Sequence, residues 1–140
     1  MKSKEKNNII FLRLFPNEDI NEQLKKACEN HNVKTAVVIS GIGQLKSARL
    51  GYFIEKGNYA PQTYTNRLEL LSLSGNICKH DSDYALHLHA ILGDEKKSTS
   101  GGHFISGKIS INGEIVLLKS DLNVQRKIDD ETGLMTLILD

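Results

Sequence analysis

Strand-forming segments follow one another along almost the whole chain, and this pattern constrains the fold more than any other feature. Apart from one helical stretch near the N-terminus, the periodic segments are short, apolar and bounded by turn-forming residues. Segments of this kind bury their apolar sides when they pair into a sheet that packs against another element. We therefore predict an α+β domain: a mostly antiparallel, barrel-like β-sheet with one flanking N-terminal helix.

Eight segments have strand character, and the residues between them predict turns. Asn112-Gly113 is a strong signal for a two-residue hairpin, and Gly41-Ile42-Gly43 ends another strand. The polar stretch Tyr52–Asn66 predicts a turn or an exposed loop. The last segment is apolar on both faces, so we expect it to be central or buried in an interface. The expected strands are residues 8–15, 35–40, 48–54, 67–74, 85–92, 104–111, 114–119 and 134–139.

One amphipathic helix follows the first expected strand. Asn17 is expected to cap its N-terminus, and Glu18 and Asp19 fall in the first turn, where the helix dipole favours acids. His31 is expected to complete the apolar face or to close the helix end. The apolar face repeats at helical spacing through Ile20, Leu24, Ala27 and Cys28.

Length and charge narrow the possible functions. The 140 residues correspond to one domain, which we expect to comprise a flexible N-terminus at 1–7 and a folded part at 8–140. Eighteen basic residues are balanced by 17 acidic ones, which argues against strong autonomous binding of nucleic acid. Two cysteines are too few for a disulfide framework, and no apolar run is long enough to span a bilayer. We expect a cytoplasmic protein without membrane contact.

Three of the five histidines form the most informative chemical pattern. His87 and His89 lie two residues apart in an expected strand, so both imidazoles leave the same face of the sheet. If the next strand returns antiparallel, His103, which follows Gly101 and Gly102, lies beside this pair. Three neutral imidazoles with an open fourth position are the ligand set of a mononuclear zinc-type site. We therefore predict a divalent transition metal, zinc by preference, at these three histidines.

Other interpretations of these residues and their neighbours stay open. The three histidines can also be surface or core residues without an ion. Asp94 is either a turn residue or a metal or imidazole partner, and Glu114 is either a solvated edge residue or a general base. Cys78 and His80 form a second, weaker metal-like pair in the loop-like segment Asn76–Tyr84. No dinucleotide, P-loop or nucleophile-elbow motif occurs, so catalytic residues are unknown and enzymatic activity stays undecided.

Five segments in a specific order carry a family resemblance. They are RLFPNEDINEQLKKACENHNVKTAVVISGIGQLKSARLGYF at 13–53, LELLSLSGNI at 68–77, LHLHAILGD at 86–94, GGHFISGKI at 101–109 and GEIVLL at 113–118. Together they resemble the PPC domain family (plants and prokaryotes conserved), and the resemblance covers residues 8–140.

The resemblance implies a largely antiparallel α/β domain with a flanking helix that assembles as a homotrimer. Plant members are nuclear DNA-binding regulators in which an AT-hook grips the minor groove, but this chain has no Arg-Gly-Arg hook. Stand-alone prokaryotic members, often labelled DNA-binding proteins, are similar in their His-x-His and Gly-Gly-His motifs. These motifs correspond to His87, His89 and His103 in this sequence.

Three functions are therefore considered. The first is a stand-alone homotrimeric domain with a three-histidine metal site, whose open position could take a small ligand. The second is a DNA-binding, transcription-associated regulator. The near-neutral net charge argues against strong binding of this kind. The third is a protein–protein assembly module, with LMTLIL at 134–139 and YFI at 52–54 in its interface.

Overall fold

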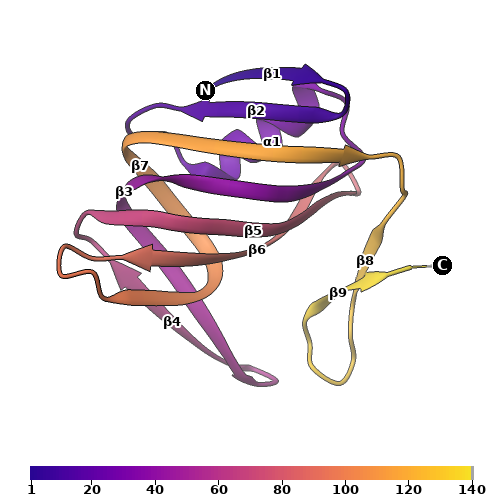
Figure 1. The fold of residues 1–140 in the computed structure, drawn as a ribbon. Coiled ribbons are helices and arrows are strands. Elements are labelled where there is room, and N and C mark those ends of the chain that lie inside the picture. The colour runs from indigo at the N-terminus through magenta and orange to yellow at the C-terminus, as the bar shows by residue number, and fades with distance from the viewer. Residues whose placement is uncertain (140) are drawn as a thin grey trace.

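The computed structural model describes residues 1–139 and contains one helix and nine strands in this part of the chain (Figure 1). The elements are β1 (Lys2–Lys6), β2 (Ile9–Leu14), α1 (Ile20–Asn30), β3 (Thr35–Glu55), β4 (Asn58–Tyr64), β5 (Leu68–His80), β6 (Asp83–Gly93), β7 (Thr99–Ser120), β8 (Gln125–Ile128) and β9 (Met135–Ile138).

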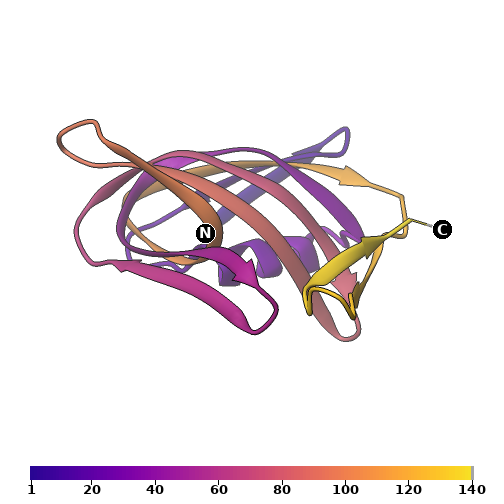
Figure 2. The same cartoon turned by 90° about the horizontal axis from the view of Figure 1, so that it is seen from below.

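Seven of the strands form one antiparallel sheet in the order β1-β2-β7-β6-β5-β3-β4. Strand β3 also pairs with β7, so β3, β5, β6 and β7 form a closed circuit of strand pairs. The sheet arches over α1 (Figure 2). The predicted fold class, a mostly antiparallel and barrel-like sheet with one flanking helix, is confirmed.

A predicted strand end and a predicted hairpin turn are wrong. Gly41-Ile42-Gly43 lies inside the 21-residue strand β3, and Asn112-Gly113 lies inside the 22-residue strand β7. Gly43 and Gly113 are paired in register, and a Cβ on Gly43 would lie 2.3 Å from the carbonyl oxygen of Asn112. These glycines therefore allow two long strands to pass close to each other, and no hairpin forms there.

Three further segments differ from the prediction. Tyr52–Asn66 forms the end of β3 and the paired strand β4, and Asn76–Tyr84 forms the ends of β5 and β6 on either side of a tight turn. Strand β9 is not central, because it pairs only with β8 in a separate two-stranded sheet; its burial in an interface between chains stays a prediction. At the N-terminus, Lys2–Lys6 is paired with β2 as strand β1 instead of forming a flexible segment.

Helix α1 begins two residues later than predicted. Asp19, and not Asn17, is the N-cap: its carboxylate accepts hydrogen bonds from the backbone amides two and three residues ahead. His31 closes the helix as its C-cap, as predicted, and its ring hydrogen-bonds to the side chains of Ser3 and Glu5. The four residues of the predicted apolar face are all buried in the core. Among the described residues, no helix has the length and apolar character needed to cross a membrane.

Strands β5 and β6 approach each other closely at Gly75. The φ angle of Gly75 is +143°, and a Cβ at this position would lie 2.0 Å from the carbonyl oxygen of His87. We expect Gly75→Ala to lower the free energy of unfolding by more than about 1 kcal/mol, measured by urea denaturation. Gly93→Ala is the control, because its Cβ would contact only the flexible end of Leu71, at 3.0 Å. Equal losses in the two variants would contradict this explanation.

Both cysteines are free and buried, as the sequence suggested for Cys28. Burial raises the pKa of the Cys28 thiol to about 12, so almost none of the reactive thiolate exists near neutral pH. We expect neither Cys28 nor Cys78 to react with Ellman's reagent in the native protein, and both to react in denaturant. Rapid labelling of the native protein at either position would contradict the packing described here.

Candidate metal centre

The three histidines come from two neighbouring strands of the large sheet. His87 and His89 lie on β6, and His103 lies on β7 directly opposite His89. Leu88, between the first two, is buried in the core, so strand alternation directs both imidazoles to the other face of the sheet. The antiparallel return predicted from the sequence is therefore correct.

The three imidazoles lie at nearly equal distances from one another. Their ring centroids are 5.3 Å (His87–His89), 5.4 Å (His87–His103) and 5.5 Å (His89–His103) apart. One ring nitrogen of each can be chosen so that all three lie within 4.8 Å of one another. Within residues 1–139 this is the one group of three or more histidine, cysteine or acidic side chains with such a spacing.

The protonation of these imidazoles suits metal binding. Burial lowers the pKa of both His87 and His103, because an imidazolium loses more solvation than a neutral ring. The charge of Arg126 lowers the pKa of His87 further, and the other two histidines of the group lower that of His103. Neutral imidazole is the form that ligates a metal.

The donor set fits zinc in number and chemistry, and small side-chain rotations would fit it in distance. Three nitrogens at about 2.0–2.1 Å from a tetrahedral ion lie about 3.4 Å apart. The ring nitrogens here lie within 4.8 Å of one another, so rotations of the side chains would bring them into this range. Gly102, the residue before His103, lets β7 pass close to β3, because a Cβ at this position would lie 2.8 Å from the carbonyl oxygen of Gly51 on β3.

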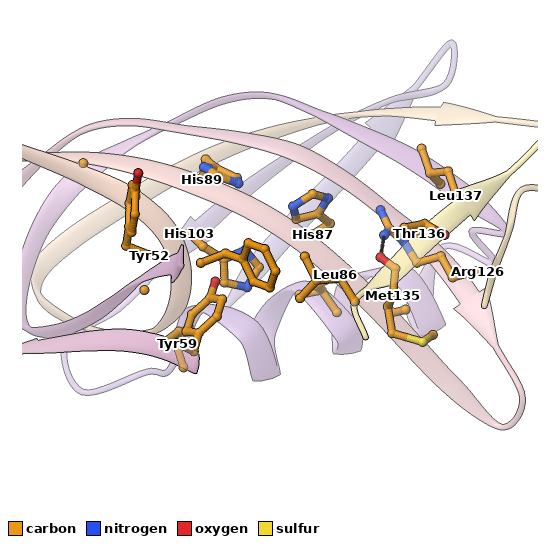
Figure 3. Close-up of a pocket in the computed structure, with 17 residues that line it drawn as sticks. Tyr52, Tyr59, Leu86, His87, His89, His103, Arg126, Met135, Thr136 and Leu137 are labelled. Atoms are coloured by element: carbon orange, nitrogen blue, oxygen red, sulfur yellow. Dashed lines mark hydrogen bonds between the residues drawn. The ribbon is translucent and has the colours of Figure 1, made fainter. Parts of the chain in front are cut away.

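A large pocket opens at the three histidines. Its volume is about 1070 Å³, and strands β3, β4, β6, β7 and the β8–β9 hairpin contribute to its walls. The Tyr59 ring meets His103 edge-on at a centroid distance of 6.0 Å, and Arg126 lies at the other end of the pocket, beyond His87 (Figure 3). The pocket therefore offers space beside the three histidines.

The structure separates the other candidate residues from this cluster. Asp94 is a turn residue, since its carboxylate accepts hydrogen bonds from two backbone amides of the β6–β7 turn. Glu114 hydrogen-bonds to Asn112 and does not line the pocket. Cys78 is buried, whereas His80 is half-buried beside Asp81, and neither belongs to a cluster of three or more metal-binding side chains among the described residues.

Two residues of the pocket were not expected from the sequence. Tyr59 falls in a stretch that was predicted to be a loop, and Arg126 falls in the polar segment between β7 and the final strand. Neither has a motif around it. The pairing of β4 with β3 brings Tyr59 to the histidines, and the hydrogen bond from Arg126 to Asn76 on β5 holds Arg126 near them.

Several known proteins resemble this chain in sequence or structure. The Plants and Prokaryotes Conserved (PCC) domain matches residues 1–121. The bifunctional protein GlmU of Synechococcus sp. (strain JA-2-3B'a(2-13)) is 33% identical over 128 residues, which are 90% of this chain. The matched region makes up 19% of the length of that relative, so this chain corresponds to only a small part of it.

Solved structures show the same fold. A metal-containing protein of Archaeoglobus fulgidus is 31% identical with a TM-score of 0.85, and the match covers 96% of each chain. A plant- and prokaryote-conserved (PPC) protein of Pyrococcus horikoshii is 26% identical with a TM-score of 0.80, over 99% of this chain and 96% of that one. A protein of Bacteroides thetaiotaomicron that carries a provisional DNA-binding name is 24% identical with a TM-score of 0.91, over 98% and 96% of the two chains, and shows the fold alone. The family resemblance is confirmed: this chain belongs to the Plants and Prokaryotes Conserved domain family.

Proposed function

We propose that this protein is a metal-binding domain that holds one divalent transition metal, zinc by preference, at His87, His89 and His103. The observation that carries the proposal is the convergence of three ring nitrogens within 4.8 Å. A set of three histidines with a fourth position left to water or a ligand is typical of zinc sites that act on or bind small molecules. The three side chains would supply the ligands, and the pocket would supply space at the open position.

Two further observations support this function. The relative from Archaeoglobus fulgidus, 31% identical, is a metal-containing protein. In the present chain, lowered pKa values at His87 and His103 favour the neutral imidazoles that a metal requires. Zinc is preferred because an all-nitrogen set of three ligands and an open fourth position suit its tetrahedral geometry.

Replacing one ligand tests the metal centre. We expect His89→Ala to lower the zinc affinity by more than about 100-fold. Replacing a residue that only hydrogen-bonds to a metal ligand already lowers metal affinity by about 10–100-fold, and a ligand itself should matter more. The measurement is calorimetric titration of zinc into metal-free protein, together with the metal content of the purified protein. His80→Ala is the matched control, because it also removes an imidazole but lies outside the cluster.

One molar equivalent of zinc should bind to the wild-type protein and to the control. Unchanged zinc binding in His89→Ala would contradict the proposal. Equal loss of binding in the control would also contradict it, because the loss would then not be specific to the three histidines.

The same proposal includes a homotrimer, for which the solvent-facing side of the sheet offers an interface. Val37 on β3 lies in register with Leu118 on β7, and Leu118 lies in register with Ile9 on β2. Exposed apolar side chains in such number on one sheet commonly mark a protein contact surface. The exposed apolar residues of strands β2, β3, β5, β6 and β7 include Ile9, Phe11, Val37, Ile39, Ile42, Leu71, Ile91, Ile111 and Leu118.

The mass in solution tests the assembly. We expect light scattering to give about 47 kDa, the mass of three chains of 15.6 kDa each. Val37→Glu should shift the protein toward the monomer, because a buried charge without a partner opposes association. Leu122→Glu, at an exposed apolar residue outside the sheet, should leave the trimer intact. A monomeric wild-type protein would contradict the assembly and leave the metal centre unaffected.

The remaining candidate functions stay predictions. DNA binding has support from the names of structures that share the fold, and the net charge of +1 argues against an extensive phosphate contact surface. A pure assembly module, with apolar residues of 52–54 and 134–139 in its interface, would need no metal. A cytoplasmic location likewise stays a prediction.

A further inference from the structure

Arg126 is a charged side chain buried in the wall of the pocket. Only 6% of its surface is exposed. Its Nη1 donates a hydrogen bond to the carbonyl oxygen of Met135 at 2.9 Å, and its Nη2 donates to Oδ1 of Asn76 at 2.6 Å. Its buried Nε has no hydrogen-bond partner within residues 1–139. A buried polar group without a partner is unfavourable, so the hydrogen bonds of the chain leave this guanidinium incompletely satisfied.

The charge of Arg126 is also not balanced by the described part of the chain. Both of its hydrogen-bond partners are neutral oxygens, and no carboxylate within residues 1–139 forms an ion pair with it. A guanidinium has five N–H donors in a planar fork, and the chain uses only two of its nitrogens. A planar fork with free donors is a recognition element for a carboxylate.

Asn76 places this guanidinium next to the metal centre. Asn76 on β5 lies directly opposite His87 on β6, and such cross-strand pairs have Cβ atoms about 4.5–5.5 Å apart. Figure 3 shows His87 between His89 and Arg126. One small molecule can therefore contact both the guanidinium and the open side of the three histidines.

The rest of the pocket is mostly apolar. Leu86 lies near His87, and Met135 and Leu137 from β9 flank Arg126 (Figure 3). The volume of about 1070 Å³ is at the upper end of the range of small-molecule sites. Such walls suit methylene groups and disfavour an ion that carries charge on all sides.

We propose that this pocket binds a small dicarboxylic acid, with one carboxylate held by Arg126 and the other at the open position of the metal. The two anionic ends would face two cationic groups, and the hydrocarbon chain between them would contact the apolar walls. For one of its two contacts this inference rests on the proposed metal centre. The β8–β9 hairpin, which carries Arg126 and Met135, would then be the ligand-recognition part of the chain.

Calorimetric titration tests the inference with malonate, succinate, glutarate and adipate as probes and inorganic phosphate as the comparison anion. In zinc-loaded protein, the acid of best-fitting length should bind at least about 10-fold more weakly to Arg126→Gln than to the wild type, because charge-assisted hydrogen bonds are lost. Lys127→Gln is the matched control, since it removes the same charge from an exposed neighbour on the same hairpin. Lys127→Gln should bind the best-fitting acid with the affinity of the wild type.

Further measurements separate recognition from a structural role of Arg126. Circular dichroism and zinc content should be unchanged in Arg126→Gln. If that variant unfolds, Arg126→Lys keeps the charge without the planar fork and should still lose affinity. Equal affinity for the best acid in the wild type and in a folded Arg126 variant would overturn the inference. Phosphate binding as tightly as any of the acids would also overturn it.

The metal-free protein distinguishes the two proposals. The best acid should bind to metal-free protein at least about 10-fold more weakly than to zinc-loaded protein. Its remaining affinity should still fall in Arg126→Gln, since the contact with Arg126 needs no metal. If zinc does not bind at all, the proposed function is contradicted. The dependence of acid affinity on Arg126 would still be measurable in the metal-free protein and would still test the present inference. Zinc binding with acid affinity independent of Arg126 would contradict only the present inference.

Discussion

The antiparallel pairing of β6 with β7 is the interaction on which the candidate site depends. It sets His89 directly opposite His103, and strand alternation adds His87 to the same face. The pairing of β6 with β5 brings Asn76 opposite His87 and so connects the cluster to Arg126. A shift of β6 by one residue would turn its imidazoles toward the core. The close contact between Gly75 and the backbone of His87 favours the observed register.

The pocket is lined by two parts of the chain, the large sheet and the C-terminal hairpin. The three histidines lie within residues 1–121, which match the family domain. Arg126 and the apolar residues of β9 follow this region and close the pocket from the side.

Local patterns predicted the fold class and the histidine cluster because both depend on strand periodicity. His87 and His89 share a face in any regular strand, and the spacing to His103 permits an antiparallel return. Local patterns failed where pairing between distant strands decided the conformation: Gly43 and Asn112-Gly113 look like turns in sequence but lie in continuous strands. Arg126 could not be identified, because its role arises from contacts with Asn76 and Met135 and not from any motif.

X-ray absorption at the zinc edge of the zinc-loaded protein tests the central claim most directly, because it reports the atoms bound to the metal. Three imidazole nitrogens on one ion predict a first shell at about 2.0–2.1 Å, with the multiple-scattering pattern of imidazole rings and an oxygen as the fourth neighbour. A sulfur neighbour at about 2.3 Å, or a shell of oxygens without imidazole scattering, would contradict it.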